Sequence, residues 1–386
     1  MPEPEADEDV LADPEEHRSE NEDANEEPSF FADPKRLIQT GVAVVLLIVA
    51  IYILFPKIVG LEDVWGTIKT GDPLWIALAV AFNIGAFAAY VALFRGVVGE
   101  RILHLEWTES YQITMAGLAA TRLFSAGGAG GILLTYWALR KAGMEPRQSA
   151  CRMLAFLVVL YSVYLLALVI FGILLRTGVL HGNAPLSMTL IPAAIAGGVI
   201  VIVFLIALLP DDFERRIEGM TSGRLARIAK RIATAPATLA QGTRTAITFV
   251  RHPSSGTLAV GGAIGFWASN IAILWASFHA FDVSVPLGVV VQGFFVGMVA
   301  NLFPLAPGGV GAVDAGMIGA FVLFGLPESE VFAAVLVYRA IAFWLPIPPG
   351  IVAFFQLRKT VQRWEDEGRE GRPAPATRAD PEAARI

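Results

Sequence analysis

Cysteine is almost absent from this chain, with Cys151 the only one among 386 residues. A single cysteine excludes an internal disulfide and any zinc site built from several cysteines. The five histidines are scattered along the chain without a metal-ligand spacing. The sequence therefore predicts neither a metal site nor a cofactor.

Charged residues are also scarce, at 17% of the chain, whereas 55% of the residues are hydrophobic. An average soluble domain has about 25% charged residues and about 45–50% apolar ones. Mean hydropathy is +0.59, and several apolar runs exceed the roughly 18 residues that cross a bilayer. This composition predicts an all-α, polytopic membrane protein, for which no nucleic-acid partner is expected.

About six apolar segments have the length of a full membrane span. They are residues 37–59, 74–98, 153–175, 190–209, 258–281 and 331–357. Two further segments, 111–139 and 285–326, are apolar but interrupted by glycine or proline, and each predicts a broken, re-entrant helical hairpin. Such interruptions in the two halves of a chain point to a transporter's midplane binding site. They also suggest a possible inverted repeat.

The ends of the chain differ in composition from the membrane region. Residues 1–34 are rich in Glu and Asp, which predicts a disordered acidic tail, and residues 358–386 predict a second disordered tail. Between them, residues 35–357 form the predicted transmembrane domain. Within it, residues 211–253 are basic with apolar residues at helical spacing, typical of a helix lying on the membrane surface. An equally good interpretation is a topology marker alone.

The distribution of Lys and Arg predicts the orientation of the chain. The loop at 140–152, the connection at 211–253 and the C-terminal tail are the basic segments. Basic loops remain on the cytoplasmic side. We therefore expect a multi-pass protein of the cell (plasma or inner) membrane with both termini in the cytoplasm.

The second interrupted segment carries an unusual motif from residue 301 to residue 316. Its prolines remove backbone donors, and its glycines allow turns that other residues resist. A new helix is predicted to begin near Gly311, and the free N–H groups of its first turn would favour an anion. The candidate substrate-binding residues here are Asn301, Pro304, Pro307, Gly308, Gly309, Gly311 and Asp314.

The first interrupted segment has a polar, glycine-dense centre. Its candidate substrate-binding residues are Arg122, Ser125, Gly128 and Gly131. The alternative for Gly127 and Gly131 is a helix-packing face of small residues.

Three charges are predicted deep in the membrane: Arg122, Asp314 and Arg339, with Tyr338 beside the last. An unpaired charge at mid-bilayer costs about 2.5–3.5 kcal/mol. In one interpretation Asp314 pairs with one arginine and only locks two helices. In the other, two cations, one anion and two helix N-termini form a positive cavity for a phosphate. Asp314 would then orient an arginine or take up a proton.

The motif Pro-Leu-Ala-Pro-Gly-Gly-Val-Gly-Ala-Val-Asp (304–314) resembles the hallmark of the lysylphosphatidylglycerol synthase transmembrane-region family, also called flippase-like. The glycine-rich run from Arg122 and the last span from Tyr338 to Gly350 are similar to that family's other motifs. The family more often has Glu at the position of Asp314. The resemblance implies an integral membrane protein related to the lipid-flipping half of those synthases, without their soluble synthase domain.

The leading functional hypothesis is translocation (flipping) of an anionic phospholipid or lipid-linked intermediate between leaflets. A membrane-embedded transferase acting on a lipid phosphate is a second hypothesis, but it needs a base or metal site, and no such constellation is found in the sequence. We therefore do not expect an enzyme. A third hypothesis is a proton-coupled small-solute transporter with Asp314 as the proton carrier.

Overall fold

The computed structural model describes residues 70–98, 105–123, 129–208, 240–249, 251, 253–302 and 311–368. The acidic tail, the predicted span at 37–59 and most of the basic connection at 211–253 lie outside the described residues. Within the described residues every regular element is a helix. The predicted all-α class is confirmed.

Five helices are long and apolar enough to cross a membrane. Each corresponds to a predicted span, and the remaining predicted span is the one outside the described residues. The five are α5 (Pro73–Val98), α8 (Pro146–Arg176), α9 (Leu190–Ala207), α12 (Pro253–His279) and the segment Glu328–Asp366. This last segment joins α15 (Glu328–Arg339), a π-helical turn (Ala340–Trp344) and α16 (Ile347–Asp366).

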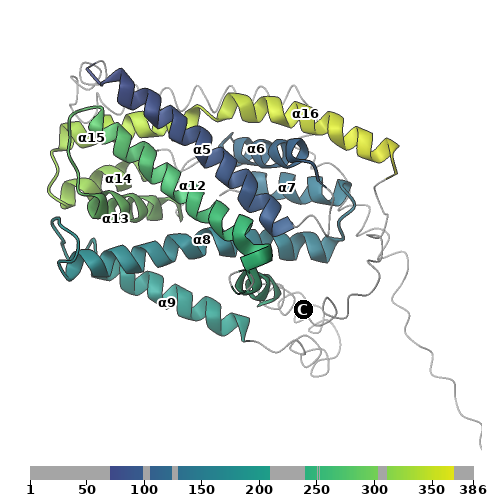
Figure 1. Ribbon diagram of the computed structural model, residues 1–386, viewed down its shortest axis with the longest axis horizontal. Coiled ribbons are helices and arrows are strands. Elements are labelled where there is room, and N and C mark those ends of the chain that lie inside the picture. Colours follow the sequence, from purple (N-terminus) through teal and green to yellow (C-terminus); the bar gives the residue numbers. More distant parts are fainter. Residues whose placement is uncertain are drawn as a thin grey trace, which may run out of the picture.

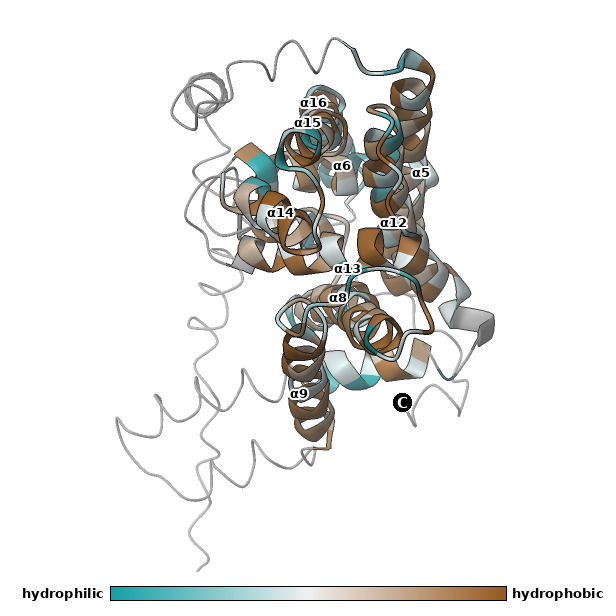
Figure 2. Ribbon diagram, turned by 90° about the vertical axis from the view of Figure 1, so that its left-hand side faces the viewer, coloured by the Kyte–Doolittle hydropathy of each residue, from teal (hydrophilic) through white to brown (hydrophobic). Residues whose placement is uncertain are grey.

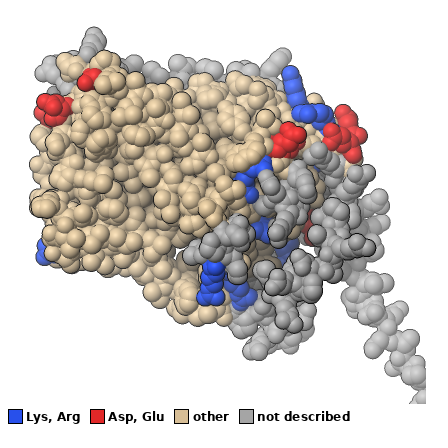
Figure 3. All heavy atoms as spheres, viewed as in Figure 1, with Lys and Arg blue, Asp and Glu red and all other residues tan. Residues whose placement is uncertain are grey.

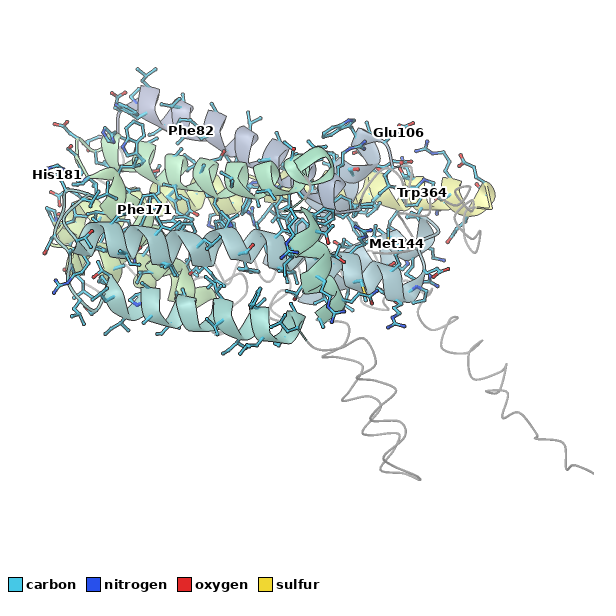
Figure 4. The ribbon with its side chains drawn as sticks, turned by 60° about the horizontal axis from the view of Figure 1, so that its bottom comes forward. Phe82, Glu106, Met144, Phe171, His181 and Trp364 are labelled. Atoms are coloured by element: carbon cyan, nitrogen blue, oxygen red, sulfur yellow. The ribbon has the colours of Figure 1, made fainter. Side chains whose placement is uncertain are left out.

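The two interrupted segments form helical pairs. The first consists of α6 (Trp107–Leu123) and α7 (Ala129–Lys141). The second consists of α13 (Leu287–Met298) with a 3-10 turn (Val299–Leu302), followed by α14 (Ala312–Leu323). Figure 4 shows Glu106, just before α6, and Met144, just after α7, at the end of the molecule opposite His181. The first pair therefore enters and leaves at one end.

The second pair starts and finishes at the other end. Gly182 lies against Val289 and Pro286, beside the start of α13, and Gly325, just after α14, lies near Asn183. The hairpins α6–α7 and α13–α14 thus enter the bundle from opposite ends, as the sequence predicts.

Within each hairpin the two arms cross at glycines. A Cβ on Gly131 would collide with the Thr121 hydroxyl and the Gly117 carbonyl, and Gly316 lies against the Gly297 carbonyl. Only residues without a side chain permit such close approach of helix backbones. Gly131 is therefore a packing residue, which supports the packing alternative for this position.

The helices that precede the hairpins, α5 and α12, pack against each other along their lengths in antiparallel directions (Figure 1). The Asp72 N–H, at the start of α5, donates to the Ala280 carbonyl at the end of α12 at 2.8 Å. At the opposite end of the pair, Gly96 of α5 meets the backbone of Ala259.

The helices that follow the hairpins exchange partners. α8, after the first hairpin, packs against α13 of the second, where the Tyr164 hydroxyl donates to the Phe295 carbonyl. The segment after the second hairpin packs against the first, because α16 lies along α6. The hairpin and the long helical segment after α5 thus have counterparts after α12, and α9 is the described helix outside this correspondence. This pattern agrees with the inverted repeat suggested by the sequence.

The outer surface is apolar between two charged ends. Figure 3 shows a broad face of uncharged side chains, with most of the visible charges gathered at one end. Helix α9 illustrates this surface best, since it packs on α8 and leaves Ile195 65% exposed and Leu205 58% exposed (Figure 2). Exposed aliphatic side chains of this kind suit contact with lipid tails.

The prediction of a disordered tail from residue 358 is wrong for its first part. Helix α16 continues to Asp366, because Leu357, Val361 and Trp364 recur at helical spacing and are buried against the first hairpin. The Trp364 indole donates to the buried Glu109 carboxylate at 3.0 Å. Residues 369–386 lie outside the described residues.

Candidate functional site

Three predicted charges meet where the two hairpins approach the last span. Arg122 lies in the last turn of α6, Asp314 in the first turn of α14, and Arg339 at the end of α15. The guanidinium carbons of both arginines lie over the Phe343 ring, Arg122 at 5.3 Å from its centroid and Arg339 at 4.4 Å. The structure thus gathers charges from elements that are distant in the sequence.

Arg339 and Asp314 form a buried ion pair. The distance from Arg339 Nε to Asp314 Oδ1 is 2.7 Å, with side chains 6% and 12% exposed. Since an unpaired charge at this depth is costly, the pair offsets a penalty that either group would bear alone. Asp314 therefore pairs with an arginine, which is Arg339, and this contact is common to both interpretations of the carboxylate.

The start of α14 is where the sequence predicts it, because Gly311 adopts a φ of 81° immediately before the helix. This left-handed angle favours glycine. The Gly311 N–H donates to Asp314 Oδ2 at 2.8 Å. The predicted anion at this helix N-terminus is therefore present within the chain itself, as the Asp314 carboxylate, and that N–H is already used.

Arg122 has a different set of partners. Its Nη1 donates to the Phe343 carbonyl at 2.7 Å, and no carboxylate among the described residues forms an ion pair with it. The sequence contains no Asp or Glu between residues 110 and 144, nor between 303 and 310. With Arg339 neutralised by Asp314, the cluster of three charges retains about one positive charge, at Arg122.

The contribution of helix dipoles is smaller than the sequence suggests. Each hairpin brings one helix C-terminus and one helix N-terminus toward the centre of the bundle. The partial charges at these ends have opposite signs and offset each other. The C-termini therefore offset part of the positive charge expected from the two N-termini, and the full charges of the side chains dominate the site.

Tyr338 is buried beside the cluster, and its hydroxyl lies 3.5 Å from Asn270 Oδ1 on α12. Its ring packs edge to face on Phe294 of α13. The tyrosine therefore connects the last span to α12 and α13.

Two residues of this region are missing from the sequence prediction. Asn83 of α5 donates its Nδ2 to the Ile341 carbonyl at 3.0 Å, and Phe343 supplies the ring and carbonyl described above. A lone Asn inside an apolar span is a signal that could have identified Asn83, because buried amides in membranes need partners. No comparable signal distinguishes Phe343 from other aromatic residues of the span.

The remaining candidates differ in outcome. The structure brings Arg122, Gly311, Asp314, Tyr338 and Arg339 together, whereas Gly131 serves the arm crossing. Asn301 lies in the 3-10 turn after α13, and its side chain is not described. The candidates outside the described residues are Ser125, Gly128, Pro304, Pro307, Gly308 and Gly309.

Taken together, the spans, the opposed hairpins and the buried charge cluster define a multi-pass membrane protein with an internal polar site. Comparison with known protein families matches residues 38–350 to the lysylphosphatidylglycerol synthase TM region. The chain belongs to this family, as its motifs suggest.

Individual relatives agree with this assignment. The chain is 25% identical over 318 residues to a UPF0104 membrane protein of Methanothermobacter thermautotrophicus, covering 77% of this chain and 89% of the relative. It is 24% identical over 109 residues to the phosphatidylglycerol lysyltransferase of Staphylococcus haemolyticus, covering 28% of this chain and 13% of that protein. The second match therefore covers a small part of that protein.

Proposed function

We propose that this protein moves an anionic phospholipid or lipid-linked intermediate between the leaflets of the membrane, with the lipid phosphate bound at Arg122. One observation carries this proposal: Asp314 neutralises Arg339, while the contacts of Arg122 in the described residues include no carboxylate. A cation held inside a membrane protein without a counter-ion is expensive. An anionic head group supplies the missing charge.

The chemistry of arginine favours phosphate as that group. A guanidinium has several N–H donors in a planar fork that matches two phosphate oxygens. The Phe343 carbonyl engages Nη1, which leaves other donors of the same group for a ligand. The outer helices present aliphatic side chains, along which acyl chains can lie while the head group is inside.

A flipping assay in liposomes tests this function. The purified protein is reconstituted into phosphatidylcholine vesicles containing a trace of fluorescent phosphatidylglycerol, and a membrane-impermeant quencher reports the lipid that reaches the outer leaflet. We expect Arg122→Gln to slow flipping at least about thirtyfold, because a buried charge contact of about 2 kcal/mol or more is lost. Arg122→Lys retains part of the rate.

The matched control is Lys359→Gln, which removes a positive charge from an exposed position on α16. We expect it to flip at the wild-type rate. Equal rates for Arg122→Gln and Lys359→Gln, with both proteins folded, would refute the proposed role of Arg122.

The same vesicles separate the two other functional classes. A transferase would change the chemical structure of the lipid when given a donor, and mass spectrometry of the extracted lipid detects such a product. A proton-coupled solute transporter would accumulate solute when a pH gradient is applied. We expect neither result, because the proposed role of the protein is movement without chemical change.

We further propose that the protein lies in the cell membrane with its N- and C-termini in the cytoplasm. The described residues at the end carrying the first hairpin include Arg140, Arg147 and Arg244, which by the positive-inside rule face the cytoplasm. Reporter domains fused to each terminus test this orientation in cells. A reporter active only outside the cytoplasm would contradict it.

A further inference from the structure

The last span is interrupted at the point where it passes the charge cluster. Residues Ala340–Trp344, immediately after Arg339, form a π-helical turn in which the Leu345 N–H donates to the Ala340 carbonyl at 3.0 Å. This bond joins residues five apart in the sequence, whereas an α-helical bond joins residues four apart. Single π turns inside helices are rare and occur frequently at functional sites.

The sequence explains why this turn cannot close as a regular helix. Pro346, Pro348 and Pro349 follow it and have no N–H. In the register of the π turn, where a carbonyl accepts from the fifth residue after it, the carbonyls of Ile341, Phe343 and Trp344 therefore find no N–H donor. Interrupted backbone inside a membrane protein persists only where other groups satisfy it.

Side chains from the other half of the molecule supply two of the donors. The Ile341 carbonyl, whose α-helical donor Leu345 is used elsewhere, accepts from Asn83 of α5 at 3.0 Å. The Phe343 carbonyl accepts from Arg122 of the first hairpin at 2.7 Å. Asn83 is 2% exposed, so its amide faces no water and its bond has a fixed partner.

The Arg122 guanidinium therefore has two competing hydrogen-bond acceptors, the Phe343 carbonyl and the phosphate of a bound lipid. A phosphate that meets the free N–H groups first and then binds through Nη1 and Nη2 together takes the nitrogen that bonds the Phe343 carbonyl. The bond to the carbonyl then weakens or breaks. The Phe343 carbonyl belongs to the only π turn among the described residues, so the change is transmitted to the junction of α15 and α16.

We propose that the Phe343 carbonyl accepts the Arg122 hydrogen bond when no lipid is bound, and that a lipid phosphate displaces this carbonyl and thereby loosens the π turn. Asn83 is then a positioning residue, which holds the turn through the Ile341 carbonyl. This inference rests on the proposed function, since it specifies how the same arginine responds to the lipid. The two hairpins are joined through this turn, because Arg122 belongs to the first hairpin and Arg339, next to the turn, binds Asp314 of the second.

Hydrogen–deuterium exchange of residues 340–347 tests the displacement directly. The detergent-solubilised full chain is measured with dihexanoyl-phosphatidylglycerol and with dihexanoyl-glycerol, which lacks the phosphate. We expect the phosphate lipid to speed exchange of this segment several-fold and the neutral lipid to leave it unchanged. In Arg122→Gln, exchange is faster by about tenfold without any lipid, because the charge-assisted bond is missing, and the phosphate lipid adds nothing.

The role of Asn83 has its own readout. We expect Asn83→Leu to raise the resting exchange of residues 340–347 and to lower the maximal flipping rate by about tenfold, since the turn has lost a buried partner. The lipid fraction that gives half-maximal flipping stays within about twofold, because Asn83 does not contact the lipid. Ser277→Ala is the control, since its buried hydroxyl bonds only within α12, to the Ile273 carbonyl. It changes neither quantity.

The outcomes separate this inference from the function on which it rests. Normal flipping with no phosphate-dependent exchange at 340–347 overturns the displacement and leaves the function intact. A phosphate-dependent change without any flipping overturns the function and supports the displacement. Failure of both signals rejects both. In Asn83→Leu, the lipid fraction that gives half-maximal flipping could rise by the same factor as the maximal rate falls. That result would assign Asn83 to lipid binding instead of positioning.

Discussion

The two hairpins have the same architecture but opposite charges. Each brings two short helices into the bundle, and in each the arms cross where glycine removes the side chain: Gly117 with Gly131 in the first, Gly297 with Gly316 in the second. The first delivers a cation, Arg122, and the second a carboxylate, Asp314.

The difference lies in how each charge is satisfied. Asp314 accepts a hydrogen bond from the Gly311 N–H and pairs with Arg339, so the charge on its hairpin is balanced. Arg122 binds a backbone carbonyl, which has no full charge to offset its own. A symmetric scaffold thus holds an asymmetric site, in which one hairpin is fixed by an ion pair and the other retains charge for a ligand.

We expect the largest effect on stability when the ion pair between Asp314 of the second hairpin and Arg339 is removed. Asp314→Asn leaves Arg339 buried without a counter-ion and lowers the free energy of unfolding by about 3–5 kcal/mol. Denaturant or thermal unfolding in detergent measures it. Glu328→Gln, at an exposed carboxylate, is the control and stays within about 0.5 kcal/mol.

The double variant Asp314→Asn with Arg339→Met removes both charges. We expect it to regain most of the lost stability, because a buried pair replaced by uncharged side chains is often neutral. If Asp314→Asn alone is as stable as the wild type, the ion pair does not lock the second hairpin.

The arm crossing of the first hairpin gives the next largest effect. A methyl group on Gly131 meets Thr121 and the Gly117 backbone, so Gly131→Ala destabilises the protein by about 1–3 kcal/mol. Gly319→Ala is the matched control on the second hairpin, since a Cβ there meets nothing within 4 Å. Melting temperatures of the two variants compare them. Equal melting temperatures would contradict the role of Gly131 in the close packing of the two arms.

The extension of α16 gives the smallest effect. Trp364→Phe keeps an aromatic ring of smaller size and loses the indole N–H bond to the buried Glu109 carboxylate, so we expect a loss of about 1–3 kcal/mol. A truncation after residue 357 should cost more, because buried Trp364 and Val361 are also removed. Protease resistance of α6 reports whether the first hairpin loosens. An unchanged hairpin in the truncated protein would contradict a supporting role for α16.

The sequence was sufficient to predict the architecture of the described part of the chain. Long apolar runs define the spans, and the glycines and prolines define the interruptions, because both follow from backbone hydrogen bonding in a membrane. The helix starting after Gly311 was predictable for the same local reason. The prediction of a disordered segment directly after Leu357 was wrong, because the buried residues Val361 and Trp364 lie among charged residues in the sequence.

The charges of the site were predictable, but their pairing was not. Arg122, Asp314 and Arg339 stand out in an apolar chain, yet which arginine meets the carboxylate depends on how three distant segments pack. The roles of Asn83 and Phe343 depend on carbonyls freed by a π turn, which arises only when the last span meets both halves of the bundle. Such long-range satisfaction of backbone groups leaves little trace in a single sequence.

The proposed function requires that Arg122 retains a positive charge and that a lipid phosphate neutralises it. Native mass spectrometry measures it most directly, by comparing the fraction of wild-type and Arg122→Gln protein that carries dihexanoyl-phosphatidylglycerol at one lipid concentration. We predict that wild-type protein and Lys359→Gln retain the lipid and that Arg122→Gln, still folded, does not. Equal retention by all three proteins would contradict the account.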